Sequence, residues 1–205
     1  MPGSRVPAPG VAVRRARPDD LAAAGLVFEA AAPAYTRLAG SAERARRVVA
    51  LTWARPGHSA SFEHALVAAV DGELVGVLIG FPERDRYRLH RALLRATLRH
   101  LSPGRWPLLL AALPPLVLAT PRPPRGAYYI GTIAVARYAR WRGVAATLAH
   151  HAELAAEARG FRQLVAHTGT RHAIARRALE NHGFRLRRAR RNGYALYVKT
   201  LGRRA

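Results

Sequence analysis

The stretch TIAVARYARWRGVAATL, residues 132–148, contains the transition that decides the fold. Its first residues continue an apolar, β-branched run that predicts a strand over Ala127–Val135. Its last residues begin an amphipathic run that predicts a helix from Gly143 to Arg159, and Gly160 ends that run. An arginine-rich loop lies between the two. The segment is therefore predicted to be a strand, a basic loop, a glycine and a helix.

The junction of loop and helix has the properties of a phosphate-binding site. The first N–H groups of a helix have no intrahelical acceptor, and the helix dipole favours an anion there. Gly143 is expected to let a phosphate approach closely, and Ala145 and Ala146 keep the first turn free of bulk. Arg140 and Arg142 can add charge-assisted hydrogen bonds. Together these features predict a pyrophosphate seat.

The flanking residues predict the rest of a mixed sheet. The expected downstream elements are a strand (Phe161–Thr168), a helix (His172–Asn181) and a hairpin (Leu186–Arg190 and Tyr194–Thr200, turning at Asn192-Gly193). The expected upstream elements are a strand (Val11–Ala16), a helix capped by Asp19 or Asp20 and running towards Ala32, a helix from Ser41 to near Pro56, and a hairpin (Ala65–Val70 and Leu74–Ile79, turning at Asp71-Gly72). A strand–helix–strand crossover implies one parallel pair, whereas hairpins imply antiparallel neighbours.

Residues 82–125 interrupt this alternation. Arg86–Leu101 places leucines on one helical face and arginines mostly elsewhere, and the apolar run Pro107–Ala119 that follows is broken by Pro114-Pro115. We interpret the segment as an inserted helical pair or lid. Its leucines would most simply pack on the sheet; a substrate lid and contact of a basic amphipathic helix with a membrane surface are the alternatives. The apolar run is shorter than the about 20 residues of a transmembrane helix.

Arg140-Trp-Arg-Gly143-Val-Ala145 resembles the Arg/Gln-x-x-Gly-x-Gly/Ala motif with which GNAT acetyltransferases hold the CoA pyrophosphate. The preceding strand is similar to the superfamily's fourth strand, whose splayed end exposes backbone groups to pantetheine, here around Ile133–Val135. Gly183-Phe184, before the last hairpin, also resembles the end of the family's closing helix. The resemblance covers residues 11–200 apart from 82–125.

The resemblance implies an α/β (α+β) GNAT fold with a central mixed, mostly antiparallel sheet of six to seven strands, helices on both faces and a helical insertion at 82–125. Residues 11–200 are expected to form one domain, residues 1–10 a flexible tail and residues 201–205 a basic tail. Acetyl-CoA is the implied cosubstrate, without a metal. The residues expected to bind it are Ile133, Ala134, Val135, Arg140, Arg142, Gly143, Val144, Ala145, Ala146 and His172.

The activity implied by the resemblance is direct transfer of an acetyl group from acetyl-CoA to a primary amine in a ternary complex. Backbone N–H groups near Val135 would polarise the thioester carbonyl and stabilise the oxyanion. Leu179 stands where many family members carry a tyrosine that protonates the CoA thiolate. The thiolate is therefore expected to leave without a protein acid.

Two residues are candidates for the group that takes a proton from the amine. Tyr129 stands where some relatives place a catalytic glutamate, on a strand face expected to hold residues 129, 131, 133 and 135. A phenol with a pKa of about 10 is a poor base at neutral pH, so Tyr129 could instead order a water. His167, near the end of the neighbouring strand, has a suitable pKa and is expected close by. A buried structural histidine is the alternative for His167.

The chain carries 34 Lys and Arg against 12 Asp and Glu, a net charge of +22. This field attracts anions such as CoA phosphates, nucleic acid or anionic membranes without selecting between them, so non-specific anionic partners are expected. Arg185–Arg191 could contact phosphates, but no helix-turn-helix, zinc-finger or aromatic-studded RNA-binding motif occurs. A basic nucleic-acid-associated protein and a GNAT-fold binding module without catalysis are the alternatives from other functional classes.

The expected acceptor is the amine of a small molecule. A cationic acceptor would be repelled by so positive a surface unless Glu63, Glu83 or Asp85 lines the cleft, which favours an amine that is not strongly cationic. A protein N-terminus or lysine is the alternative.

The chain has no cysteine, which excludes disulfides, thiolate metal sites and cysteine nucleophiles. No His, Asp or Glu group has metal-ligand spacing. Residues 1–10 lack the apolar run of a secretory signal. We expect a cytoplasmic monomer or homodimer without a transmembrane segment.

Overall fold

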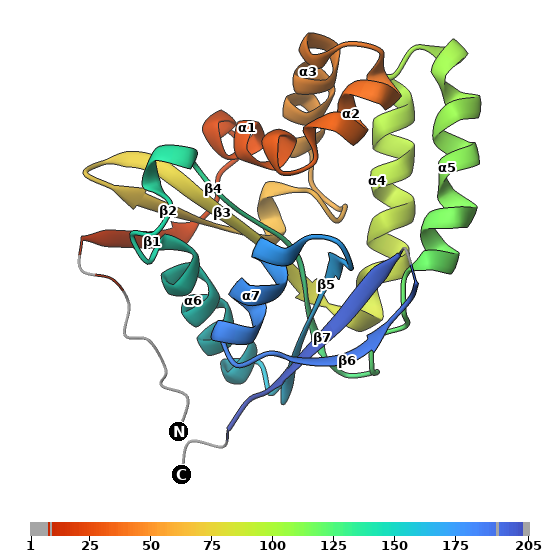
Figure 1. Ribbon diagram of the computed structural model, residues 1–205. Coiled ribbons are helices and arrows are strands. Elements are labelled where there is room, and N and C mark those ends of the chain that lie inside the picture. Colours follow the sequence, from red (N-terminus) through yellow and green to blue (C-terminus); the bar gives the residue numbers. More distant parts are fainter. Residues whose placement is uncertain (1–7, 9, 192, 203–205) are drawn as a thin grey trace.

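The central sheet of the computed structural model has seven strands in the order β1-β2-β3-β4-β5-β7-β6 (Figure 1). All neighbouring strands are antiparallel except β4 and β5, which run parallel. The strands are Val11–Arg15 (β1), Ala65–Val70 (β2), Glu73–Pro82 (β3), Tyr128–Val135 (β4), Gln163–Gly169 (β5), Arg185–Ala189 (β6) and Tyr194–Thr200 (β7). The structure describes residues 8, 10–191 and 193–202. The predicted mixed, mostly antiparallel sheet is confirmed.

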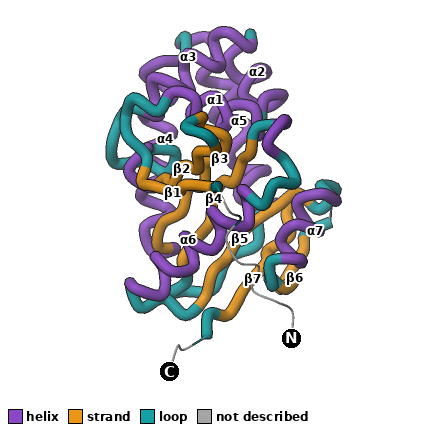
Figure 2. Tube along the Cα trace, turned by 90° about the vertical axis from the view of Figure 1, so that its left-hand side faces the viewer, coloured by secondary structure: helices purple, strands orange, loops and turns teal. Residues whose placement is uncertain are grey.

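Helices lie on both sides of the sheet, as predicted (Figures 1 and 2). One side carries α6 (Val144–Ala158) and α7 (Ala173–Asn181). The helices on the other side are α1 (Leu21–Ala30), α2 (Ala32–Ala39), α3 (Ala42–Trp53), α4 (Arg86–His100) and α5 (Trp106–Ala119).

The start of the chain differs from the prediction at two points. The helix expected to run towards Ala32 ends at Ala30, because Ala31 leaves the helical conformation with φ −140°, and α2 then begins. Asp20 occupies the N-cap position of α1 without capping it. Its carboxylate instead accepts hydrogen bonds from the Arg14 guanidinium (2.7 Å) and from the Arg17 N–H (2.7 Å), so it joins the end of β1 to the turn.

Residues 82–125 form the predicted helical pair, α4 and α5. Only Leu89 of the α4 leucines belongs to the main core against the sheet; Leu94 and Leu98 pack instead on a second cluster built from α1, α2 and α3. α5 continues through Pro114-Pro115, where a break was expected. Both prolines are exposed, so water can bind the carbonyls that the missing N–H groups leave free.

The two expected tails fall largely outside the described residues, which exclude 1–7, 9 and 203–205. Leu201, where the basic tail was expected to begin, is buried, and its N–H donates to the Arg162 carbonyl (2.9 Å). The domain therefore extends beyond its expected end at residue 200.

α6 packs closely on the sheet because β3 has a glycine beneath it. A Cβ added at Gly76 would lie 2.7 Å from Val144 Cγ1 and 3.0 Å from Leu148 Cδ1. Ala152 and Ala156 continue the same buried stripe of α6 at a spacing of one helical turn. The N-terminus of α6 is thus held next to the sheet, beside the end of β4.

β4 carries a bulge at Gly131. Ile79 of β3 pairs with Thr132 and Gly80 pairs with Ile130, which leaves Gly131 without a partner residue on β3. One extra residue in a strand reverses the alternation of side chains between the two faces beyond it.

The bulge overturns the predicted face of β4. Tyr129 shares its face with Thr132, on the side of α1 and α4, whereas Ile133 and Val135 lie on the face that α6 covers. The prediction that residues 129, 131, 133 and 135 share one face is wrong, because it assumed unbroken alternation. The bulge therefore assigns Tyr129 and the far end of β4 to opposite sides of the sheet.

Two alanine substitutions should separate close packing from helix propensity. Gly76→Ala should lower the free energy of unfolding by about 1–3 kcal/mol, because Val144 and Leu148 leave no room for a Cβ. Gly25→Ala in α1 should raise it by about 0.4–1 kcal/mol, since a Cβ there meets no atom within 4 Å. Denaturant unfolding measures both, and equal effects of the two changes would contradict the packing of α6 described above.

Candidate functional site

The parallel pair β4 and β5 separates soon after it begins. The two strands are paired only over Tyr128–Ile130 and Leu164–Ala166. Beyond this, β4 stays paired with β3 up to Val135, and β5 stays paired with β7 up to Gly169. A wedge therefore opens between them, and Ile133 on its edge is 41% exposed. The structure has the splay that the sequence predicted around Ile133–Val135.

A basic loop connects the end of β4 to α6. Arg140, Trp141 and Arg142 are exposed, and Arg140 Nε donates to the Val135 carbonyl (3.4 Å), which ties the loop to the wedge. No described side chain caps α6, so its first N–H groups remain available to a ligand. The residues of the first turn of α6 that were predicted to bind the cosubstrate are only partly exposed. Val144 is buried, and Ala145 and Ala146 are half-buried. The loop and helix end together can hold an anion.

Gly143 has a structural role in addition to the predicted one. Its φ of 77° lies in the left-handed region that side chains disfavour. A Cβ there would lie 2.7 Å from the Cβ of Ala8, whose N–H donates to Thr147 Oγ1 (3.0 Å). The missing side chain thus makes room for Ala8. The approach of a phosphate to Gly143 stays a prediction.

Tyr129 and His167 are brought together at the point where the wedge opens, as the sequence predicted. The nitrogen Nε2 of His167 lies 2.8 Å from the Pro121 carbonyl, which can only accept, so Nε2 carries the proton. Nδ1 is then the acceptor for the Tyr129 hydroxyl at 3.3 Å. This tautomer leaves the basic nitrogen of His167 facing the phenol.

Tyr129 is buried, His167 is half-buried, and both are electrically neutral. Burial lowers the pKa of His167 below its ordinary value of 6.5; the Pro121 hydrogen bond opposes this, and the positive charge of Arg86 adds to it. Burial also raises the pKa of Tyr129. At neutral pH the site therefore holds an uncharged imidazole and an uncharged phenol, which can pass a proton between them.

Arg86 and His90, one turn apart on α4, line the same cluster. The Arg86 guanidinium lies over the Tyr129 ring with its carbon 5.9 Å from the ring centroid. The His90 ring stands edge-on to Tyr129 at 6.5 Å. Burial and Arg86 lower the pKa of His90 to about 4, so it too is neutral at pH 7. Arg86 is thus the cation that acts on all three neighbouring ionisable groups.

Two further aromatic residues, one from each of two strands, act on Tyr129. Phe81 of β3 packs on Tyr129 with 5.4 Å between centroids. Tyr194 of β7 is paired with Gly169 and so shares the face of His167, and its electrostatic interaction with Tyr129 raises the pKa of that phenol. The insertion and the strands therefore build the cluster together.

The acidic candidates do not supply a free carboxylate to this cluster. Glu83 Oε1 lies 3.8 Å from Arg86 Nε, and Asp85 pairs with Arg88 at 3.4 Å. Glu63 accepts a hydrogen bond from the Gly57 N–H (2.6 Å) in the loop before β2. Glu83 and Asp85 are therefore each already next to an arginine.

α7, which resembles the closing helix of the family, contains no tyrosine. Leu179 packs against the main core, as its apolar side chain requires. His172 occupies the N-cap position of α7 with an exposed side chain, and its ring does not cap the helix.

Sequence reasoning did not identify Arg86, His90 or Tyr194 as site residues. Arg86 and His90 are four residues apart, so helical spacing alone places them on one face. What no local pattern shows is that this face of the insertion meets Tyr129.

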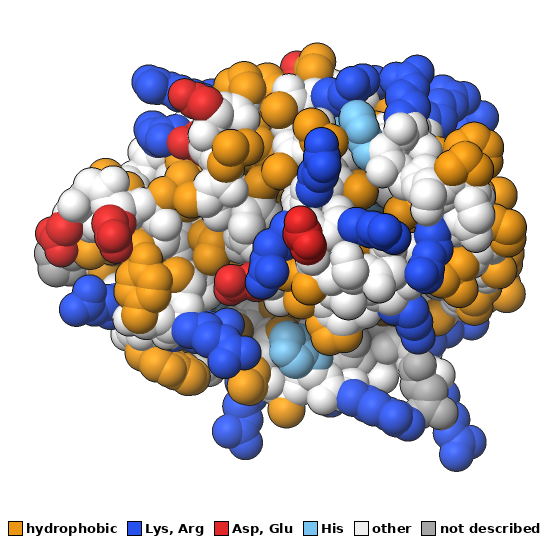
Figure 3. Space-filling model, turned by 90° about the horizontal axis from the view of Figure 1, so that it is seen from above, with side chains coloured by type: hydrophobic (Ala, Val, Ile, Leu, Met, Phe, Trp, Pro, Cys, Tyr) orange, Lys and Arg blue, Asp and Glu red, His pale blue; other side chains and the backbone are white. Residues whose placement is uncertain are grey.

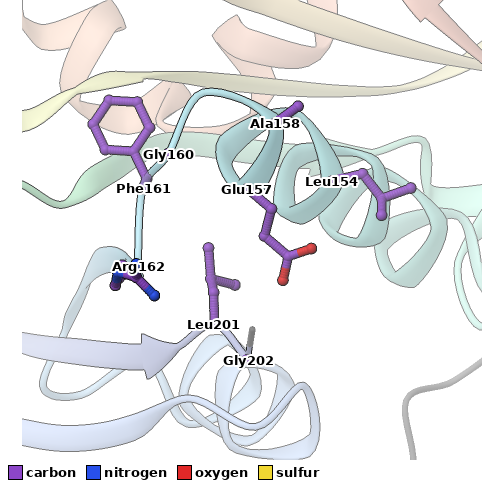
Figure 4. Close-up of a pocket in the computed structure, with 8 residues that line it drawn as sticks. All are labelled: Leu154, Glu157, Ala158, Gly160, Phe161, Arg162, Leu201 and Gly202. Atoms are coloured by element: carbon purple, nitrogen blue, oxygen red, sulfur yellow. The ribbon is translucent and has the colours of Figure 1, made fainter. Parts of the chain in front are cut away.

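A separate pocket of about 490 Å³ lies at the other end of α6, away from the wedge (Figure 4). None of the predicted site residues lines it. Its lining residues are Leu154, Glu157, Ala158, Gly160, Phe161, Arg162, Leu201 and Gly202. Within the described chain, no group of three or more His, Asp or Glu residues is placed to hold a metal ion.

Comparison with known proteins adds three findings. The family model described as "Acetyltransferase (GNAT) family" matches residues 27–184. No curated protein sequence matches the chain. Among solved structures, one described as an acetyltransferase is similar over 93% of this chain and 100% of its own, with 20% identity and a TM-score of 0.71.

Two further solved structures share the fold. An N-acetyltransferase from Staphylococcus aureus Mu50 is 18% identical over 91% of this chain and 99% of its own, with a TM-score of 0.67. The PaiA N-acetyltransferase from Thermoplasma acidophilum, solved in complex with coenzyme A, is 10% identical over 93% of this chain and 98% of its own, with a TM-score of 0.53.

Gly143→Ala should lower the free energy of unfolding by about 1–2 kcal/mol even without any ligand, because a side chain is strained at this φ and collides with Ala8. Gly104→Ala is the matched control, since a Cβ there meets no atom within 4 Å. Urea unfolding of both variants tests this prediction. If Gly143→Ala were as stable as Gly104→Ala, the strain at this φ and the contact with Ala8 would not explain why residue 143 is a glycine.

Proposed function

The chain belongs to the GNAT acetyltransferase family, and we propose that it transfers the acetyl group of acetyl-CoA directly to the primary amine of a small molecule within a ternary complex. One observation carries this proposal: the wedge between β4 and β5 has an uncapped helix N-terminus at one side and the Tyr129–His167 pair at the other. The first suits an anionic cosubstrate, and the second suits proton removal from an amine.

The proposed cosubstrate fits the residues at the start of α6. The free N–H groups of the first turn, with Arg140 and Arg142, would hold the pyrophosphate. Ile133, Ala134 and Val135 border the wedge in which the pantetheine chain would lie, and His172 would approach it from α7. Acetyl-CoA supplies the thioester that the amine attacks.

The proposed proton path follows the hydrogen bonds of the cluster. An acceptor ammonium at the wedge gives its proton to the Tyr129 oxygen as the phenol proton passes to His167 Nδ1. The free amine then forms a bond to the thioester carbonyl carbon, and backbone N–H groups near Val135 stabilise the oxyanion. The carbon–sulfur bond breaks, and the new amide nitrogen loses its second ammonium proton to water. With Leu179 in place of a phenol, the thiolate takes a proton from solvent, and the His167 imidazolium returns its proton to solvent through Tyr129.

The charge of the cluster supports an acceptor that is not strongly cationic. Arg86 lies against Tyr129, and the nearest carboxylate, Glu83, is already next to it at 3.8 Å. Among the described residues of the cluster, no carboxylate is free to pair with a second cationic group on the acceptor. Aromatic and imidazole rings form the rest of the cluster, which suits an acceptor with an apolar part. Because α4 covers this side of the sheet, a small acceptor is favoured over a protein segment.

Calorimetry with acetyl-CoA tests the cosubstrate site. Arg142→Ala should weaken binding by about tenfold, since a charge-assisted hydrogen bond contributes about 1.5–3 kcal/mol when fully formed. Ala145→Asp should weaken it further while leaving thermal stability unchanged, because a carboxylate at a helix start repels phosphate yet suits the dipole. Arg47→Ala on α3 removes the same charge far from the wedge and should have no effect. Equal weakening by Arg47→Ala would show general charge attraction only.

Steady-state kinetics with a panel of small amines tests the proton path. Tyr129→Phe and His167→Gln should each lower kcat by about 10²–10⁴-fold with little change in the KM for acetyl-CoA. Tyr128→Phe is the matched control, because that phenol lies on the opposite face and donates to the Gly80 carbonyl (2.8 Å). If Tyr128→Phe lost activity and Tyr129→Phe did not, the proton path would be assigned to Tyr128 in place of Tyr129.

The pH dependence of the same reaction has a defined sign. His167 accepts a proton only when neutral, and its pKa lies below 6.5, so kcat/KM should be constant near neutral pH and fall as the pH drops through that pKa. Arg86→Gln removes a charge that lowers this pKa, so the fall should begin at a higher pH. An unshifted profile in Arg86→Gln would exclude His167 as the group that titrates.

A further inference from the structure

α5 is apolar on every face and yet lies at the surface. None of its 14 residues, WPLLLAALPPLVLA, is polar or charged. Leu109 is its only fully buried residue, while Val117 is 69% exposed and Leu118 is 73% exposed. A helix that is hydrophobic all round normally lies inside a core or in contact with lipid. This helix therefore lacks the environment that its composition requires.

Few contacts hold α5 to the rest of the chain. Leu109 joins the second cluster, next to Phe28 and Leu101. Trp106 Nε1 donates to the Leu101 carbonyl (3.2 Å). At the other end, Gly193 in the β6–β7 turn approaches the Ala119 carbonyl so closely that a Cβ would lie 2.7 Å from it. The outward side of the helix is left open along its length (Figure 1).

Positive charge surrounds this apolar helix. Figure 3 shows apolar side chains gathered at the right-hand end of the molecule, where α5 lies, with basic side chains beside them. β6, whose turn meets the end of α5, is exposed at every residue and has the sequence RLRRA. The exposed arginines of these two neighbouring elements are Arg91, Arg95 and Arg99 on α4 and Arg185, Arg187 and Arg188 on β6. Among the described ion pairs, none involves these six side chains.

We propose that α5 and the arginines of α4 and β6 form a docking surface for an anionic lipid bilayer. An apolar helix beside cationic side chains matches an interface in which acyl chains lie below anionic headgroups. A second copy of this chain fits less well, since two arginine borders would face each other and each copy carries +22. This inference does not depend on the proposed reaction.

The helix would lie along the membrane surface and not cross it. At about 1.5 Å per residue, 14 residues span about 21 Å, less than the about 30 Å of a hydrocarbon core. No helix of the described residues is long and apolar enough to cross a bilayer. Val117 and Leu118 would enter the acyl region, while the arginines stay at the headgroups.

Flotation of the full chain with vesicles tests this surface, with phosphatidylcholine vesicles compared with vesicles that also contain phosphatidylglycerol. The wild-type chain should float with the anionic vesicles and at least about tenfold less with the neutral ones, and high salt should reduce binding. Val117→Asp with Leu118→Asp should weaken binding by at least about tenfold, because both side chains lose their apolar contact. Arg187→Glu with Arg188→Glu should remove the preference for anionic vesicles.

Matched controls lie on α7, on the opposite side of the sheet. Ile174 is 69% exposed there, so Ile174→Asp changes an equally exposed apolar residue, and Arg177→Glu reverses an exposed arginine. Both should bind vesicles like the wild-type chain. The proposal is overturned if the wild-type chain fails to float, or if these controls lose as much binding. It is also overturned if light scattering shows a dimer that Val117→Asp with Leu118→Asp dissociates, because a second copy would then cover α5.

Discussion

The early separation of β4 and β5 is the constraint on which the rest of the molecule depends. After three paired residues on each strand, β4 continues with β3 and β5 continues with β7, so both arms of the wedge stay paired on their outer sides. Their inner sides have backbone groups that must bind something other than a strand. A fixed opening of this kind accepts an extended ligand without any rearrangement of the sheet.

Two features of the backbone then divide the opening into two sides. Gly76 lets α6 approach one face of the sheet, which places its uncapped start beside the end of β4. Gly131 inserts one residue into β4, which directs Tyr129 to the other face. An anionic cosubstrate and an amine can therefore reach the wedge from different directions. Neither needs to leave before the other binds, in keeping with the ternary complex we propose.

The parts of the fold that depend on local chemistry could be predicted from the sequence. The turn at Asp71-Gly72 and the helix start after Gly143 have strong local signals, and both occur where they were expected. The proximity of Tyr129 and His167 could also be predicted, because parallel pairing places equivalent positions side by side. These predictions required only the local signals for turns and helix starts, together with the correct pairing of β4 with β5.

The remaining features depend on tertiary contacts. A glycine within a strand does not reveal whether it forms a bulge, so the face of Ile133 was predicted wrongly. The left-handed φ of Gly143 follows a local rule, but its contact with Ala8 does not. Arg86 and His90 were missed because their role depends on how the insertion folds back onto β4.

The carbonyl of Pro121 links the insertion to the chemistry of the sheet. It belongs to the segment that leads from α5 back to β4, and it holds the proton of His167 on Nε2. The insertion is therefore not an interchangeable module. A relative that lacked it, or a chimera that carried another segment in its place, would need a new acceptor at this position to keep the imidazole in the same protonation pattern. His167 and the insertion are thus expected to be inherited together.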